Sequence, residues 1–135
     1  MMKLTKTQKL LIAFCYSDNN ALRYEFVFDK PCDYFAVRFF LNEYSYFLVE
    51  FPDENNSDKV RVTEWETVKS SYHPSDRCTH LNKYLSKYRD DGKSATLNVQ
   101  DLTKRLHNIP MPQGFMRDRS SYRPWRETRR ASGRF

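Results

Sequence analysis

The first residues of the chain carry the polar and apolar pattern of an amphipathic helix. Thr5 is followed three residues later by Gln8, which is the pairing found in a capping box at a helix N-terminus. The apolar residues that come next are Leu10, Leu11, Ile12, Phe14 and Cys15. The pattern therefore predicts a first helix over about residues 6–16.

From residue 22 to residue 68 the apolar residues recur with a period of two, which is typical of strands with one buried face. Two of these runs are rich in aromatic and β-branched residues, and only four residues separate them, so we predict a hairpin there. The last run follows a polar loop. The region predicts four consecutive strands over 22–28, 34–41, 46–51 and 60–68.

The same alternation divides the side chains of the predicted sheet between two faces. The face that we assign to the core holds Phe35, Val37, Phe39, Leu41, Phe47, Val49 and Phe51. The opposite face holds Tyr34, Arg38, Phe40, Tyr46, Arg61 and Trp65. If this face is open, its rings and guanidinium groups form a platform for stacking bases. Two other interpretations stay open: a helix or a partner subunit covers the face, or the face binds a protein.

After Pro74 the apolar residues follow the period of a helix. Ser75 is a favourable N-cap and Gly92 a favourable residue just past a helix end. The apolar stripe between them consists of Cys78, Leu81, Leu85 and Tyr88. A shorter third helix is predicted over 98–107, and Pro110 ends the folded region. The order of elements predicts an α+β fold, a small antiparallel four-stranded sheet packed with about three helices, in one compact domain over 1–110.

Length and composition are consistent with one domain. The chain has 135 residues, of which 39% are hydrophobic and 30% charged. It contains no run of about 18 apolar residues and no signal-type N-terminal stretch, so we expect neither a membrane span nor a secretory leader. The three cysteines, at positions 15, 32 and 78, share no CxxC spacing, which favours free thiols in a reducing, intracellular compartment.

Charge is concentrated at the C-terminal end. The net charge of the chain is +6, and residues 111–135, here called the C-terminal arm, hold seven arginines against two acidic residues, so five of the six net charges lie in this segment. The arm is an extended basic tail without a single lysine. Its arginines and its two candidate stacking residues are Arg117, Arg119, Arg123, Arg126, Arg129, Arg130, Arg134, Tyr122 and Trp125.

Arginine without lysine favours recognition of phosphate or carboxylate through the planar guanidinium fork, and aromatic residues between the arginines suit base stacking. We therefore predict a protein without enzymatic activity that binds nucleic acid, RNA before DNA, or a nucleoprotein assembly. The arm and the sheet residues Arg38, Arg61 and Trp65 are its candidate binding residues. The alternative is a protein-interaction module, an inhibitor, adaptor or assembly subunit, viral or cellular, whose arm docks in an acidic groove of a partner.

The motifs of established enzyme classes are missing from the sequence. Three glycines in the whole chain leave no Gly-rich phosphate loop, and neither G-x-S-x-G nor HExxH occurs. Asp53, Glu64 and Glu66 loosely resemble the PD-(D/E)xK nuclease pattern, which implies Mg²⁺ held by carboxylates at a strand end. The resemblance departs where Glu66 stands in place of lysine. We expect the strand to bend or end near Thr63 and to leave both glutamates in solvent.

Metal binding has one further candidate. His73, Cys78 and His80 are residue types that bind zinc, but a structural zinc site needs four ligands in paired spacings, and the spacing here is not one of these. Cys78 also fits the apolar stripe of the second predicted helix. We predict neither a metal nor another cofactor.

Overall fold

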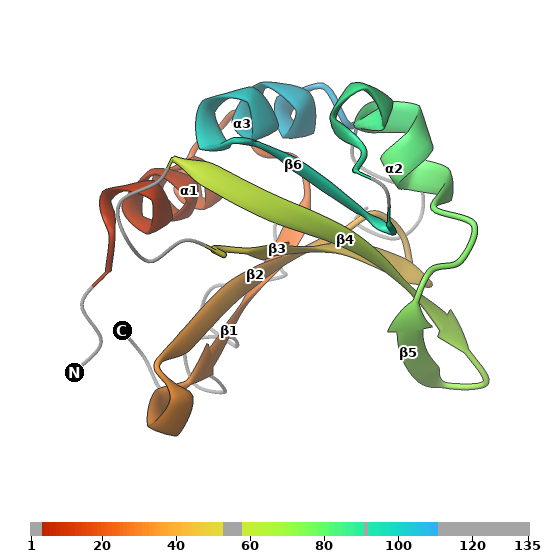
Figure 1. Ribbon diagram of the computed structural model, residues 1–135. Coiled ribbons are helices and arrows are strands. Elements are labelled where there is room, and N and C mark those ends of the chain that lie inside the picture. The colour runs from red at the N-terminus through yellow and green to blue at the C-terminus, as the bar shows by residue number, and fades with distance from the viewer. Residues whose placement is uncertain (1–3, 53–57, 91, 111–135) are drawn as a thin grey trace.

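The computed structural model describes residues 4–52, 58–90 and 92–110. It is an α+β fold in which three helices pack against one side of a sheet (Figure 1). The helices are α1 (Lys6–Tyr16), α2 (Thr79–Tyr84) and α3 (Val99–His107), with the short 3-10 turns η1 (Lys30–Cys32) and η2 (Ser86–Tyr88). The strands are β1 (Arg23–Asp29), β2 (Tyr34–Phe40), β3 (Ser45–Glu50), β4 (Lys59–Val68), β5 (Ser71–Pro74) and β6 (Ser94–Asn98).

All strand pairs are antiparallel, and the order across the sheet is β1-β2-β3-β4-β5, with β6 also paired to β4. The ten-residue strand β4 pairs with two different strands along one of its edges. Its first half, from Lys59 to Thr63, pairs with β6, and its second half, from Trp65 to Val68, pairs with β5. The sheet is therefore five strands wide, with β5 and β6 sharing the last position.

The prediction of a four-stranded sheet is wrong, because the sheet has six strands. The four predicted strands are present within one or two residues of their expected bounds. The two missed strands are short and give little periodic signal. All four residues of β5 are exposed, and β5 depends on a tight turn in which Lys69 and Ser70 both have positive φ. In β6 only Ala95 and Leu97 alternate inward.

The first helix is confirmed. The Gln8 N–H donates to Thr5 Oγ1 at 3.1 Å, and the Thr5 N–H donates to Gln8 Oε1 at 2.8 Å, so both halves of the capping box are formed. These bonds satisfy two backbone donors at the start of α1 and fix the entry of the chain into the helix layer.

The second predicted helix is much shorter than expected. Ser75 does not cap it, and α2 begins only after Cys78, whose φ of 51° lies in the left-handed region. Ser75 Oγ instead accepts the Cys78 N–H at 3.0 Å, within the turn that leads into α2. At the other end Leu85 leaves helical geometry, and η2 follows. The predicted apolar stripe still points inward at Leu81 and Leu85, which are fully buried.

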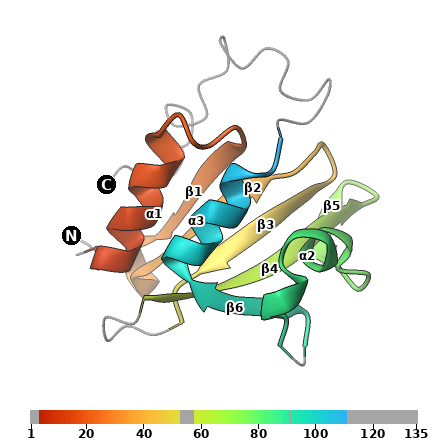
Figure 2. The same ribbon diagram turned by 90° about the horizontal axis from the view of Figure 1, so that it is seen from above.

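The helices share one layer. Seen from above, α1 lies over the β1 and β2 side of the sheet, α3 over its middle and α2 over β4 (Figure 2). None of the described helices is long and apolar enough to cross a membrane. The core lies between the helices and the sheet, and its largest fully buried side chains include Phe39, Phe47, Leu11, Leu22, Leu81, Leu97, Leu102 and Leu106.

Candidate functional site

The face of the sheet turned away from the helices is called the helix-free face below. Among the described residues no helix lies on it (Figure 1). Strand pairing confirms the predicted assignment, since Phe40 lies opposite Tyr46 and Tyr46 opposite Trp65. The interpretation in which a helix covers this face is thus wrong for the described part of the chain. The residues of this face include Arg23, Glu25, Tyr34, Arg38, Phe40, Tyr46, Glu50, Arg61, Trp65, Thr67 and Tyr72.

Aromatic rings are in contact across four strands at one end of this face. The ring centroids of Phe40 and Tyr46 lie 5.4 Å apart, and those of Tyr46 and Tyr72 4.9 Å apart. The rings of Tyr46 and Trp65 are parallel within 3° at 6.2 Å. Tyr46 lies at the centre and is only 5% exposed, whereas Tyr72 at the rim is 40% exposed. We call these four residues the aromatic cluster.

Arginine side chains lie over two of these rings. The guanidinium carbon of Arg23 is 4.8 Å from the Phe40 ring centroid, and that of Arg38 is 5.3 Å from the Tyr46 centroid. Cations attract the negative face of an aromatic ring, so both arginines are held against the sheet. Phe40, which is 7% exposed, and Tyr46 owe part of their burial to these contacts, although no second layer of described secondary structure covers them.

Ion pairs occupy the rest of the face. Arg38 Nη1 donates to Glu25 Oε1 at 2.6 Å, and Arg61 Nη2 donates to Glu50 Oε1 at 3.4 Å. The Tyr34 hydroxyl donates to Glu50 Oε2 at 2.8 Å. Burial, followed by this hydrogen bond to Glu50, raises the pKa of Tyr34 well above its usual value. The positive charges of two arginines are thus balanced by carboxylates on the same face.

Polar groups without a partner also gather here. Within the described residues, the Nε–H of Arg38, the indole N–H of Trp65 and the hydroxyl of Thr67 are buried and have no hydrogen-bond partner. Buried polar groups in native proteins are nearly always paired, so each exception needs an explanation. The first two are pure donors, and all three residues belong to the helix-free face.

Two corners of the sheet bend away from the helices, one at η1 between β1 and β2 and the other at the β4–β5 hairpin (Figure 1). The aromatic cluster lies toward the second corner, because Tyr72 is on β5. Tyr34 lies directly after η1, toward the first corner. Along β4, Trp65 and Arg61 are four residues apart, or about 13 Å at roughly 3.3 Å per residue. The face therefore has rings at one end, with Arg23 and Arg38 lying over two of them, and the guanidinium group of Arg61 further along β4.

Glu64 lies on the opposite, helix-covered side, and the expectation that it would be in solvent is wrong. Strand β4 continues through this position, and Glu64 is only 2% exposed. Its Oε1 accepts the backbone N–H groups of His80 at 2.8 Å and Leu81 at 3.0 Å, and its Oε2 lies 2.8 Å from His80 Nδ1. The carboxylate thus takes the place of a local N-cap and anchors α2 to β4.

The pKa of Glu64 follows from these contacts. Burial alone would raise its pKa, but the hydrogen bonds from the His80 ring and the Leu81 N–H, together with the charge and the backbone N–H of His80, outweigh burial and lower it. Glu66 lies 3.5 Å from Arg77 in an exposed ion pair. Asp53 lies outside the described residues. The nuclease interpretation stays a prediction, with Glu64 engaged in holding the fold together.

The three candidate zinc ligands each have different surroundings and do not converge on one point. His80 is engaged with Glu64, and the buried Cys78 thiol donates to the Ser75 carbonyl at 3.4 Å. His73 is on the exposed strand β5. Over residues 4–52, 58–90 and 92–110, no group of three metal-ligating side chains is placed to hold an ion. All three cysteines are free, as expected from their spacing, and Cys32 alone is exposed.

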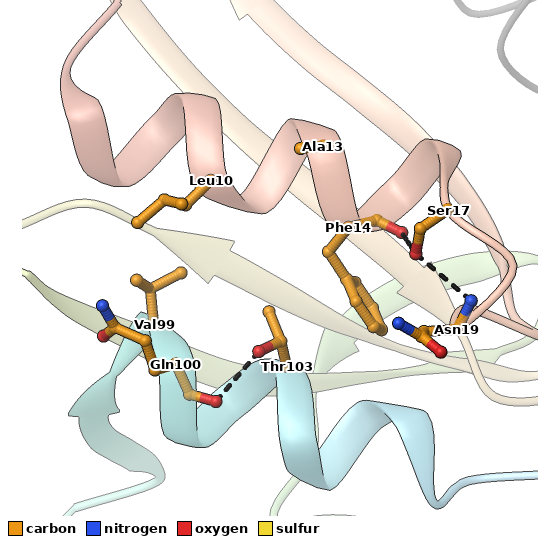
Figure 3. A pocket seen from close by; sticks show the side chains of 8 residues that line it. All are labelled: Leu10, Ala13, Phe14, Ser17, Asn19, Val99, Gln100 and Thr103. Carbon is orange, nitrogen blue, oxygen red and sulfur yellow. Dashed lines mark hydrogen bonds between the residues drawn. The ribbon is translucent and has the colours of Figure 1, made fainter.

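The helix layer carries a groove of about 290 Å³ between α1 and α3 (Figure 3). Leu10 and Phe14 line it from α1, and Val99 and Thr103 from α3. It contains no charged side chain, and the Thr103 hydroxyl already donates to the Gln100 carbonyl. The groove is a shallow apolar contact surface and offers no group for chemistry.

The structure brings together three of the predicted binding residues, Arg38, Arg61 and Trp65, on one face. The predicted arginines and aromatic residues of the C-terminal arm lie outside the described residues. Sequence reasoning missed Arg23 and Tyr72 as members of the face. Arg23 could have been found by extending the alternation of the first predicted strand, whereas Tyr72 belongs to a strand without periodic signal.

The chain matches no protein-family model, no curated protein and no solved structure, so its function has to be inferred from the residues and contacts described above.

Proposed function

We propose that this protein binds nucleic acid, RNA in preference to DNA, or a nucleoprotein assembly, and that it does so without catalysing a reaction. The observation that carries the proposal is the helix-free face, where Arg38 and Arg61 lie on the same surface as the aromatic cluster. Guanidinium groups pair with phosphate through parallel N–H donors, and flat rings stack on unpaired bases. Both kinds of contact are available on one surface.

The composition of the C-terminal arm supports the same function. Five of the six net positive charges of the chain lie in residues 111–135. A dense positive charge attracts the phosphate backbone over several ångströms and displaces its counterions, which contributes most of the sequence-independent affinity for nucleic acid. We assign long-range attraction to the arm and short-range contacts with nucleotides to the helix-free face.

Binding of a labelled single-stranded RNA by the full-length protein, followed by fluorescence anisotropy over a range of salt concentrations, tests the proposal. We expect the logarithm of the association constant to fall linearly with the logarithm of salt concentration, with a slope of about −0.7 for each phosphate engaged. Replacing the seven arginines of the arm by glutamine should flatten this slope strongly. A single-stranded DNA of the same base sequence should bind more weakly.

A control elsewhere in the molecule replaces Lys9 and Lys104 by glutamine, which removes two positive charges where the arm variant removes seven. Both are exposed lysines of the helix layer, on α1 and α3. The positive charges that this change removes are distant from the helix-free face, so the slope should stay nearly unchanged. An affinity that does not depend on salt, or an arm variant that binds as tightly as the unchanged protein, would contradict nucleic-acid binding.

A second candidate function is binding of a protein partner, and one observation favours it. The exposed residues Tyr44, Val68 and Tyr72 lie near one another at the corner of β3, β4 and β5. Arg38 on the same sheet already has its charge balanced by Glu25. Tyrosine, tryptophan and arginine are enriched in protein interfaces. Purification of the full-length protein from nuclease-treated lysate separates the two functions, because a protein partner would co-purify in fixed stoichiometry and without absorbance from nucleic acid.

A further inference from the structure

We infer that the ligand of the helix-free face is a single strand whose bases are unpaired, and that Arg38 and Arg61 exchange their carboxylate partners Glu25 and Glu50 for its phosphates. The inference rests on the proposed function and names the class of nucleic acid. It follows from three observations: the exposed ion pairs of the arginines, the buried N–H donors without a partner, and the arrangement of the aromatic rings.

The ion pairs of this face are easily exchanged. The side chains of Arg38 and Glu25 are 36% and 31% exposed, and those of Arg61 and Glu50 are 45% and 23% exposed. Ion pairs at this level of exposure are weakened by solvent. A phosphate offers the same planar guanidinium fork at least two acceptor oxygens, so the arginines lose little on leaving the carboxylates. Glu25 and Glu50 therefore compete with the ligand for the same donors.

The unpartnered donors point to a ligand rich in acceptors. The Nε–H of Arg38 and the indole N–H of Trp65 cannot accept a hydrogen bond, so only an acceptor can satisfy them. Phosphate oxygens and base carbonyls are such acceptors. The Nε–H of Arg38 belongs to the same guanidinium group that Glu25 holds, so release of Arg38 from Glu25 frees this donor to turn toward a ligand. For Arg38, the exchange of its ion pair and the pairing of its Nε–H are thus one event.

The aromatic cluster selects for unpaired bases. Tyr72 exposes its ring at the rim and Trp65 is partly exposed, while the buried Tyr46 ring lies parallel to that of Trp65 and supports it from within the cluster. A base inside a duplex is stacked on both sides by its neighbours, and only an unpaired base can turn its flat side to such rings. Bases are therefore expected at the Trp65 and Tyr72 end, and phosphates at Arg38 and Arg61, about 13 Å further along β4 in the case of Arg61.

Four full-length proteins measured against two labelled RNAs test the inference. The RNAs are a single strand and a duplex containing that strand, and the variants are Glu25→Gln, Glu50→Gln and the control Asp18→Asn. Asp18 is exposed in the loop after α1, so Asp18→Asn also removes one negative charge, but at a place distant from the helix-free face. We expect each glutamate variant to bind the single strand about two- to fivefold more tightly than the control does, because an exposed ion pair changes an equilibrium constant by up to about fivefold. Duplex binding should change by the same factor in all three variants.

The variant Trp65→Ala provides an independent measurement if a glutamate variant does not fold. Loss of one stacked base should weaken single-strand binding by about tenfold and leave duplex binding unchanged. Equal affinities of the glutamate variants and the control for the single strand, together with no effect of Trp65→Ala, would overturn the inference. In that case salt-dependent binding of both RNAs would still support the proposed function. If the unchanged protein binds neither RNA, the proposed function fails first.

Discussion

The two faces of the sheet are built from neighbouring residues of the same strands, yet they have different physical properties. On β2, Phe39 is fully buried beneath the helices, whereas Arg38 beside it forms an ion pair on the helix-free face. On β4, Val62 is fully buried and Arg61 is exposed. Because successive side chains of a strand point to opposite faces, one strand contributes both to the packed core and to the surface of rings and charged groups. The first face provides stability, and we propose recognition as the role of the second.

The largest effect that this comparison predicts concerns Phe39 and Phe40, adjacent residues of the same type on opposite faces. Phe39→Ala should lower the free energy of unfolding by about 4 kcal/mol, because it removes buried surface and leaves a cavity between sheet and helices. Phe40→Ala should cost about 2 kcal/mol, since no layer above it can enclose a cavity. Urea unfolding followed by circular dichroism measures both. Equal losses would mean that the helix-free face is packed like a core.

Glu64 is the exception on the covered face, and its removal should be nearly as costly. Glu64→Ala leaves the His80 and Leu81 N–H groups and the His80 ring without their acceptor, so we expect a loss of about 3 kcal/mol in the free energy of unfolding. Glu64→Gln keeps the shape and one acceptor oxygen, and should cost about half as much. Urea unfolding at neutral pH distinguishes the two variants. A loss confined to α2 would appear as faster amide exchange there.

The pH dependence of this site has a defined sign. Because the pKa of Glu64 is lowered in the folded protein, the stability that its charged form contributes is present above the unfolded pKa of about 4.3 and is lost as pH falls through the folded value. The difference in unfolding free energy between the unchanged protein and Glu64→Gln should therefore shrink on acidification below about pH 4.3. A difference that stays constant across this range would show that the charge of Glu64 contributes nothing.

Local periodicity predicted much of this architecture, and nonlocal contacts account for what it missed. The capping box at Thr5 and the alternation in the first four strands lie within short stretches of sequence, so they predicted α1 and both faces of the sheet. The start of α2 depends on Glu64, sixteen residues before His80, which no local pattern reveals. Strand β5 exists because it pairs with the second half of β4, and Tyr72 joined the face only through that pairing.

The smallest effect is expected at Tyr34, whose partly buried hydrogen bond to Glu50 lies on the helix-free face. Tyr34→Phe removes the bond to Glu50 and should lower the free energy of unfolding by about 1 kcal/mol at neutral pH. Because burial and Glu50 raise the pKa of Tyr34, this contribution is complete below the unfolded pKa of about 10 and is lost as pH rises above it. Urea unfolding of both proteins at neutral and alkaline pH measures the change.

Tyr44→Phe is the matched control, since Tyr44 is 64% exposed. Its variant should match the unchanged protein at both pH values. If Tyr34→Phe is as stable as this control at neutral pH, the bond to Glu50 adds nothing to stability. Among the described residues, Arg61 would then be the partner that holds Glu50, and Arg61 could move to a phosphate only by leaving this carboxylate without a partner. The measurement thus places a bound on how firmly the free protein holds the carboxylate that competes for Arg61.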